Sequence, residues 1–102
     1  MKAKNRPKLE TLANMICLSR GADPSILHSK SRKEHVVNYR KVFCALAYSQ
    51  NYSQGDIADF IGYKDHTTVN YHIKNHIALS QTDKLYRGFI RKNLLYTTKK
   101  ER

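Results

Sequence analysis

The sequence predicts an all-α fold, and three observations support this prediction. Apolar residues recur at i, i+3 and i+4 through most of the chain, which is the period of an amphipathic helix. No segment alternates apolar and polar residues for long enough to form a strand, and no internal repeat is present. The 102 residues suffice for one domain with a modest core.

The first part of the chain predicts a helix and a short turn. Apolar positions from Leu9 onward predict a helix over about 8–20, and Gly21 supplies its end. Asp23 and Pro24 together predict a single helical turn. Asp23 can cap it, and proline is favoured at the first helical position.

A polar segment precedes the longest predicted helix. Residues 29–34, SKSRKE, contain no apolar residue. They form either a basic linker that contacts phosphates or an ordinary solvated loop. The helical period returns from His35 to Gln50, where we expect the most buried helix. Its apolar stripe comprises Val36, Tyr39, Val42, Phe43, Leu46 and Ala47.

Residues 53–77 have the form of a helix-turn-helix. Ser53 can cap a short amphipathic helix whose apolar positions are Ile57, Phe60 and Ile61. Gly62 can take the left-handed conformation that ends this helix, and Asp65 can cap the next one. Two helices joined in this way, the second with an exposed polar start, are typical of a motif that places its second helix in the DNA major groove.

The second helix of this motif has two distinct faces. Its apolar face is centred on Val69, with Ile73 and His76 beside it and Ile77 at the edge. Its polar face comprises Thr67, Tyr71, Lys74 and Asn75. One face can therefore pack while the other can form hydrogen bonds.

The end of the chain predicts one more helix. Residues 80–83 offer an N-cap, and the apolar positions that follow are Leu85, Phe89, Ile90 and Leu94. Gly88 weakens this helix by about 1 kcal/mol relative to alanine. We expect residues 1–8 to be a flexible basic arm, 9–95 the folded domain and 96–102 a charged tail.

The charge balance favours a polyanionic partner. The chain has 19 Lys and Arg against 8 Asp and Glu, a net charge of +11 and a pI near 9.9, which indicates nucleic acid binding. A membrane surface is the alternative, but the basic residues are spread over every segment. No apolar run of membrane-spanning length and no secretion signal are present, so we expect a cytoplasmic protein.

The remaining reactive side chains predict neither a metal site nor catalysis. Cys17 and Cys44 lack CxxC spacing and lie in apolar helical patterns, so we expect small buried hydrophobes. His72 and His76 are i, i+4 neighbours and His66 lies nearby, but further ligands are missing, so packed or capping histidines are favoured over zinc. Asp56 and Asp59 are expected to be solvated charges on a short helix without a cleft, not a catalytic pair.

Residues 64–69, KDHTTV, resemble the C-terminal DNA-binding domain of the bacterial replication initiator DnaA, whose hallmark is an Asp-His-Thr-Thr-Val run opening the recognition helix. The resemblance extends over about 9–95, including the turn at Pro24, the basic linker and an Arg in the long helix. It implies a Trp-repressor-like helix-turn-helix fold. No GxxxxGK[ST] phosphate loop occurs, so we expect a standalone recognition module without ATPase activity, nucleotide or other cofactor.

The resemblance also implies individual contacts. Residues matching Asp65, His66 and Thr67 reach base edges in the major groove, and the one matching Thr68 contacts a phosphate. An Arg matching Arg40, aligned with one residue fewer before the helix-turn-helix, enters the adjacent minor groove.

The chain departs from the family pattern at two positions. Asn38 stands where the family usually has a basic residue, and Tyr71 stands where it has a histidine. These departures bear on the target sequence more than on DNA binding itself.

The residue chemistry is consistent with these contacts. His66 can donate or accept at a base edge, Thr67 can place a methyl group against thymine, and Asp65 can accept from the amino group of cytosine. Asp65 also has a purely structural alternative as a helix cap. Arg40 suits the narrow minor groove of A·T-rich DNA, and its alternative is an ordinary exposed basic residue. Free N–H groups at the helix start favour a phosphate beside Thr68.

We therefore expect a non-enzymatic protein that binds double-stranded DNA at a short asymmetric A·T-rich box, one copy per site, and regulates replication initiation or transcription. The expected base contacts are Arg40, Asp65, His66 and Thr67. The expected phosphate contacts are Ser31, Arg32, Lys33, Lys64, Thr68, Tyr71 and Lys74.

Three alternatives remain at this point. The first is a transcription factor on an unrelated operator. The second is a protein-interaction module that binds an initiator or replisome component. The third is a nuclease or recombinase that uses Tyr71 or His66.

Overall fold

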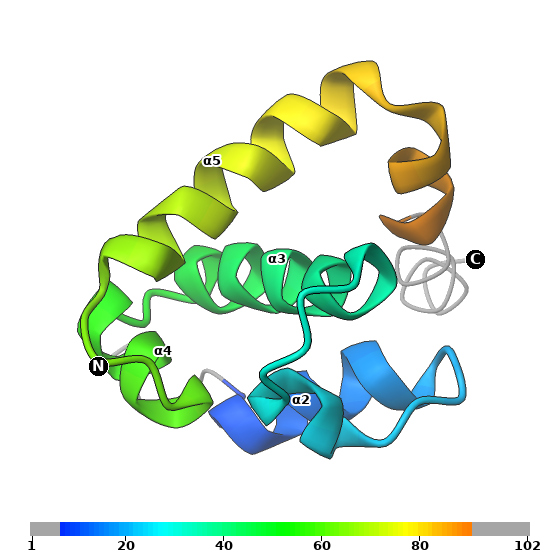
Figure 1. The fold of residues 1–102 in the computed structure, drawn as a ribbon. Coiled ribbons are helices and arrows are strands. Elements are labelled where there is room, and N and C mark those ends of the chain that lie inside the picture. Colours follow the sequence, from blue (N-terminus) through cyan, green and yellow to red (C-terminus); the bar gives the residue numbers. More distant parts are fainter. Residues whose placement is uncertain (1–6, 91–102) are drawn as a thin grey trace.

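The computed structural model describes residues 7–90, and within this range every regular element is a helix. The elements are α2 (Leu9–Leu18), the 3₁₀ turn η1 (Pro24–His28), α3 (Glu34–Ser49), α4 (Gln54–Ile61) and α5 (Thr67–Thr82), followed by a helix at 84–90 (Figure 1). The predicted all-α fold is confirmed. The predictions for most of the basic arm, for Leu94 and for the charged tail fall on residues outside the described range.

Helix α3 is the centre of the fold. It contacts α2, η1, α4 and α5, and its contact with α5 is the most extensive. Figure 1 shows α3 between α2 and α4 on one side and α5 on the other. The predicted position of this helix, 35–50, agrees with the observed bounds to within one residue at each end.

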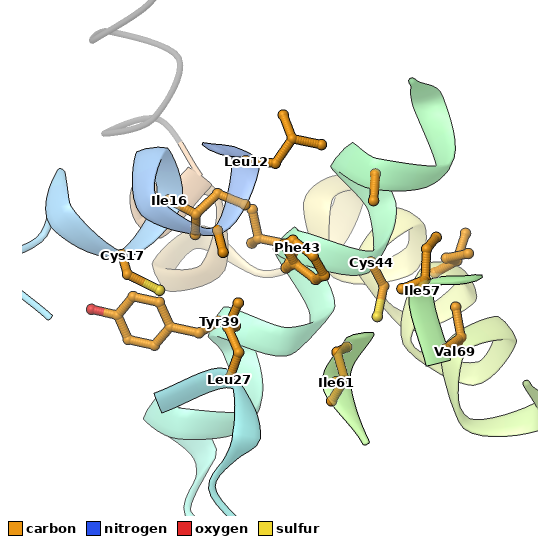
Figure 2. Close-up of a cluster of buried hydrophobic side chains, with 14 of the residues drawn as sticks. Leu12, Ile16, Cys17, Leu27, Tyr39, Phe43, Cys44, Ile57, Ile61 and Val69 are labelled. Carbon is orange, nitrogen blue, oxygen red and sulfur yellow. The ribbon is translucent and has the colours of Figure 1, made fainter. Parts of the chain in front are cut away.

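The core is formed by fully buried side chains from every element around α3 (Figure 2). Phe43 of α3 is fully buried, and its ring stacks on that of Phe60 with centroids 5.4 Å apart. The other large buried side chains are Leu12, Ile16, Leu27, Ile57 and Val69. Because burying one such side chain contributes roughly 1.5–3 kcal/mol, this cluster supplies much of the driving force for folding.

Local sequence signals fix where the elements begin and end. The Asp23 carboxylate accepts a hydrogen bond from the Ser25 N–H at 2.9 Å and starts η1. The Ser53 hydroxyl oxygen accepts from the Asp56 N–H at 3.0 Å and starts α4. Helix α2 ends at Leu18, two residues before the predicted end, and the chain then turns through a left-handed Gly21.

The last helix is rotated relative to the predicted one. The Asp83 carboxylate accepts from the Tyr86 N–H at 3.0 Å, which confirms an N-cap in the predicted range. The prediction that Leu85 faces the core is wrong, because Leu85 is 86% exposed and Tyr86 is 3% exposed. Tyr86 takes the place of Leu85, and its hydroxyl hydrogen-bonds His76 at 2.8 Å. Phe89 and Ile90 pack against the core, as predicted.

Both cysteines are buried and free, as predicted. Burial raises the pKa of Cys17 to about 11, with a smaller contribution from the nearby Asp23 charge. Burial also raises the pKa of Cys44 to about 12. Both thiols are therefore protonated at neutral pH and act as small packing groups. Across residues 7–90, no helix combines the length and apolar character needed to span a membrane.

Replacing Gly62 with alanine should lower the free energy of unfolding by about 1–2 kcal/mol, because Gly62 has φ +102° and an L-residue is strained there. The added Cβ meets no atom within 4 Å, so the cost is conformational. Gly88→Ala is the matched control: Gly88 is helical and equally open, so alanine should raise stability by about 0.5–1 kcal/mol. Urea unfolding of both variants measures these changes. A change of the same sign in the free energy of unfolding of both variants would contradict the prediction.

Candidate nucleic-acid interface

The turn between α4 and α5 is held by backbone geometry. Gly62 ends α4 in the left-handed conformation, with φ 102° and ψ 21°. Its N–H and that of Tyr63 both donate to the Ala58 carbonyl, at 2.8 and 2.9 Å. This paired bonding closes α4 and sets the direction in which the chain leaves it.

Asp65 orders the start of α5 from one residue further out than predicted. The N-cap residue is His66, which has no side-chain cap, and α5 begins at Thr67. The Asp65 carboxylate accepts a hydrogen bond from the Thr67 N–H at 2.8 Å. Asp65 is exposed, so one carboxylate oxygen can hold the first turn while the other faces solvent.

The predicted contact residues of this motif form an exposed polar surface, which we call the reading surface. Thr67, Tyr71 and Lys74 are spaced at i, i+4 and i+7 and therefore share a face of α5. Tyr71 is 60% exposed. Thr68 is half-buried, and the other members are exposed. The reading surface consists of Lys64, Asp65, His66, Thr67, Thr68, Tyr71 and Lys74.

The basic linker 29–33 is ordered by its own serines. The Ser29 hydroxyl oxygen accepts a hydrogen bond from the Ser31 N–H at 3.0 Å. The Ser31 hydroxyl oxygen accepts from the Lys33 N–H at 3.2 Å. Arg32 and Lys33 are exposed on this hydrogen-bonded segment, and Ser31 is half-buried. The Ser-x-Ser spacing is the sequence signal for such turns.

Arg40 is buried, whereas the sequence analysis predicted an exposed side chain. Both interpretations of this residue, a minor-groove contact or an ordinary exposed charge, require an exposed side chain, but Arg40 is only 6% exposed. Its Nε donates to the Leu27 carbonyl at 3.4 Å, and its Nη2 donates to the Ser29 carbonyl. A minor-groove contact would require the guanidinium to leave both carbonyls.

His72 is a buried residue that sequence reasoning missed. It lies three positions after Val69, so the helical period alone could have placed it on the packed face. Its Nε2 shares a hydrogen bond with the Tyr63 hydroxyl at 2.9 Å. Ile77, predicted at the edge of this face, is 52% exposed.

Burial controls the titration of this pair. It lowers the pKa of His72 to about 4, helped by the nearby positive charges of Arg40 and Lys41. It also raises the pKa of Tyr63 to about 12, against the smaller opposing effect of the Arg40 charge and of a hydrogen bond from Arg40. Both groups are therefore neutral at physiological pH.

Two of the three histidines considered as metal ligands, His72 and His76, have separate partners. His72 bonds Tyr63, and His76 Nδ1 bonds the Tyr86 hydroxyl at 2.8 Å. Among residues 7–90, no three His, Cys, Asp or Glu side chains come together in a way that could hold a metal ion. These histidines act as packed residues that each hold a tyrosine hydroxyl.

A short helix, a glycine turn and a second helix with an exposed polar start define a helix-turn-helix protein. The family model described as "Bacterial dnaA protein helix-turn-helix" matches residues 9–75. This chain therefore belongs to the bacterial DnaA helix-turn-helix family.

Curated relatives agree with this assignment. The chromosomal replication initiator protein DnaA of Bacteroides fragilis (strain YCH46) is 35% identical over 81 residues, which is 78% of this chain and 17% of that protein. The corresponding protein of Aliarcobacter butzleri (strain RM4018) is 31% identical over 88 residues, covering 85% of this chain and 20% of that protein. The chain thus spans about a fifth or less of these relatives. No solved structure gives a significant match.

The His72 environment predicts a loss of stability in acid. In the unfolded chain an imidazole titrates near pKa 6.5, whereas the pKa of His72 in the folded protein is about 4. Below pH 6.5 the unfolded state binds a proton that the folded state does not, so stability falls as pH drops toward 4, by at most about 3 kcal/mol from this group. Urea unfolding between pH 7 and 4 should show a smaller loss for His72→Gln than for the wild type. Identical losses would contradict the assignment.

Proposed function

We propose that this protein binds double-stranded DNA sequence-specifically through the reading surface and regulates replication initiation or transcription without performing a reaction on DNA. One observation carries the proposal: Lys64, Asp65, His66 and Thr67 are exposed at the start of α5, on a turn fixed by Gly62, while Val69 of the same run is buried. The membership in the DnaA helix-turn-helix family supports DNA binding, and the net charge of +11 supplies the electrostatic attraction.

Three exposed side chains are proposed to read bases. His66 can donate or accept at a base edge, and Thr67 can bond a base and place its methyl group against thymine. Asp65 can accept from the cytosine amino group with the oxygen that does not hold the Thr67 N–H. Because the turn already fixes the backbone, little backbone freedom would be lost when these side chains contact a base.

The remaining polar residues are proposed to position the protein on the phosphate backbone. Thr68 lies beside free N–H groups at the start of α5, which favour an anion. Lys64, Tyr71 and Lys74 extend this surface along the turn and helix. The linker residues Ser31, Arg32 and Lys33 provide a second contact segment. Such contacts fix register but carry no direct sequence information.

The proposed target is a short asymmetric A·T-rich box bound by one copy. The matched relatives are named chromosomal replication initiator proteins, which favours an initiator-type box as the first candidate. The proposal includes no nucleotide or other cofactor, because none of the residues that carry it calls for one.

The first experiment compares binding to a duplex with an initiator-type box and to a scrambled duplex of equal composition, at about 150 mM salt. A preference on the order of a thousandfold supports the proposal. Equal weak binding would contradict initiator-box recognition, and selection from a random pool would then identify any other operator. If the protein binds no duplex even at low salt but captures an initiator or replisome protein, the interaction-module alternative replaces the proposal.

His66→Ala should weaken binding to the preferred duplex by about 1–3 kcal/mol and change binding to random DNA little, because a base contact is lost. Gln81→Ala is the control, since Gln81 is exposed at the opposite end of α5. Titrations with both duplexes measure the effect. An equal loss on the two duplexes would show that His66 does not read bases.

Lys74→Ala should weaken binding to all sequences alike and reduce the slope of log K against log salt by about one unit, because one phosphate contact is lost. Lys84→Ala removes the same charge from an exposed site outside α5 and should leave the slope nearly unchanged. Matching slopes for the two variants would remove Lys74 from the contact surface.

A further inference from the structure

The buried Arg40 guanidinium holds the beginning of the basic linker. Its Nε and Nη2 donate to the carbonyls of Leu27 and Ser29, which are near the end of η1 and at the first residue of the linker. The planar guanidinium presents its N–H groups in a rigid fork, so one side chain can hold two carbonyls in a defined geometry. Arg40 therefore fixes where the linker starts relative to α3.

The same guanidinium lies close to the helix-turn-helix. Its positive charge acts on the pKa of Tyr63, in the turn before α5, and on the pKa of His72, which is buried within α5. The Tyr63 hydroxyl hydrogen-bonds His72 at 2.9 Å. Arg40 thus lies beside a buried polar pair of the helix-turn-helix, on a helix whose most extensive contact is with α5.

A second contact ties the same two regions together at a different point. His28, the last residue of η1, donates from its Nδ1 to the Ile61 carbonyl at 3.1 Å, at the end of α4. Its ring packs on Phe60 with centroids 5.4 Å apart. The end of η1, which leads into the linker, is therefore held on α4 by a hydrogen bond and a ring contact.

The linker can transmit this anchoring to its charged side chains. The hydroxyl groups of Ser29 and Ser31 hold the backbone by hydrogen bonds as far as Lys33, which is the N-cap residue of α3. In Figure 1 this segment crosses directly from η1 to the start of α3. Arg32 and Lys33 consequently project from a backbone whose position Arg40 determines.

We propose that Arg40 is a positioning residue that holds the linker 29–33 and α5 at a fixed spacing, so that both engage one duplex together. This inference rests on the proposed function and gives Arg40 an internal role in place of a base contact. Without Arg40 the linker charges are still present but are no longer held where the duplex lies when α5 is docked.

The test measures how much the linker contributes to binding with and without Arg40. On the duplex that the wild type prefers, the double change Arg32→Ala and Lys33→Ala should reduce the salt slope by about 1.8 units, at about 0.9 for each phosphate contact. In an Arg40→Lys background the same double change should reduce the slope by less than half as much. Lysine keeps the charge but lacks the fork that reaches both carbonyls.

Two further variants separate positioning from general destabilisation. Ile16→Val removes a methyl group from the core at a cost of about 0.5–1.5 kcal/mol, and it should leave the linker contribution unchanged. Tyr63→Phe deletes only the hydroxyl group that bonds His72 beside the Arg40 guanidinium, and it should reduce the linker contribution in the same direction as Arg40→Lys. It provides the test if Arg40→Lys does not fold.

An unchanged linker contribution in both the Arg40→Lys and Tyr63→Phe backgrounds would overturn the inference while leaving the proposed function standing. Loss of the preference for A·T over G·C pairs beside the box in Arg40→Lys would also overturn it, since that result indicates direct minor-groove reading. Absence of any duplex preference in the wild type is a different result, which removes the proposed function itself.

Discussion

The packing of α5 against α3 is the contact on which the rest of the structure depends. Val69 and Ile73 are buried at this contact, and α3 in turn supports every other element around it. A helix of this length is only marginally stable by itself, so its position in the protein depends on packing. The apolar face of α5 provides this support and leaves the opposite face free to bond.

Polar groups buried behind α5 add a constraint that apolar packing alone does not give. Apolar side chains contribute stability without strong direction, whereas Tyr63 and His72 bond each other, and Arg40 bonds two carbonyls, in defined geometry. Such groups are costly to bury unless they are bonded, so an arrangement that breaks these bonds is disfavoured. These hydrogen bonds therefore restrict the orientation of α5 more than apolar packing alone would.

Much of the fold could be predicted from local signals. The Ser53 cap, the left-handed Gly62 and the apolar period around Val69 each depend on neighbours in sequence, and all three are observed. The misplaced features depend on neighbours in space. The inward turn of Tyr86 follows from its bond to His76, and the burial of Arg40 follows from carbonyls eleven and thirteen residues away.

The candidate site could be predicted only in part for the same reason. The KDHTTV run is visible in the sequence because short polar residues follow the turn glycine Gly62. The helical period could have placed His72 on the packed face, but nothing in the sequence marks the Tyr63 hydroxyl as its partner. The offset between Asp65 and the true cap, His66, reflects backbone angles that several residue types could adopt.

The separation of faces on α5 has a consequence for how this protein can change over evolutionary time. Tyr71 is exposed while its neighbour His72 is buried, so adjacent positions are under unrelated constraints. Exchanging Tyr71 alters the chemistry offered to a partner with almost no effect on folding, whereas exchanging His72 disturbs the interior. Lineages carrying this domain can therefore change the exposed chemistry of α5 by single substitutions on a scaffold that stays the same.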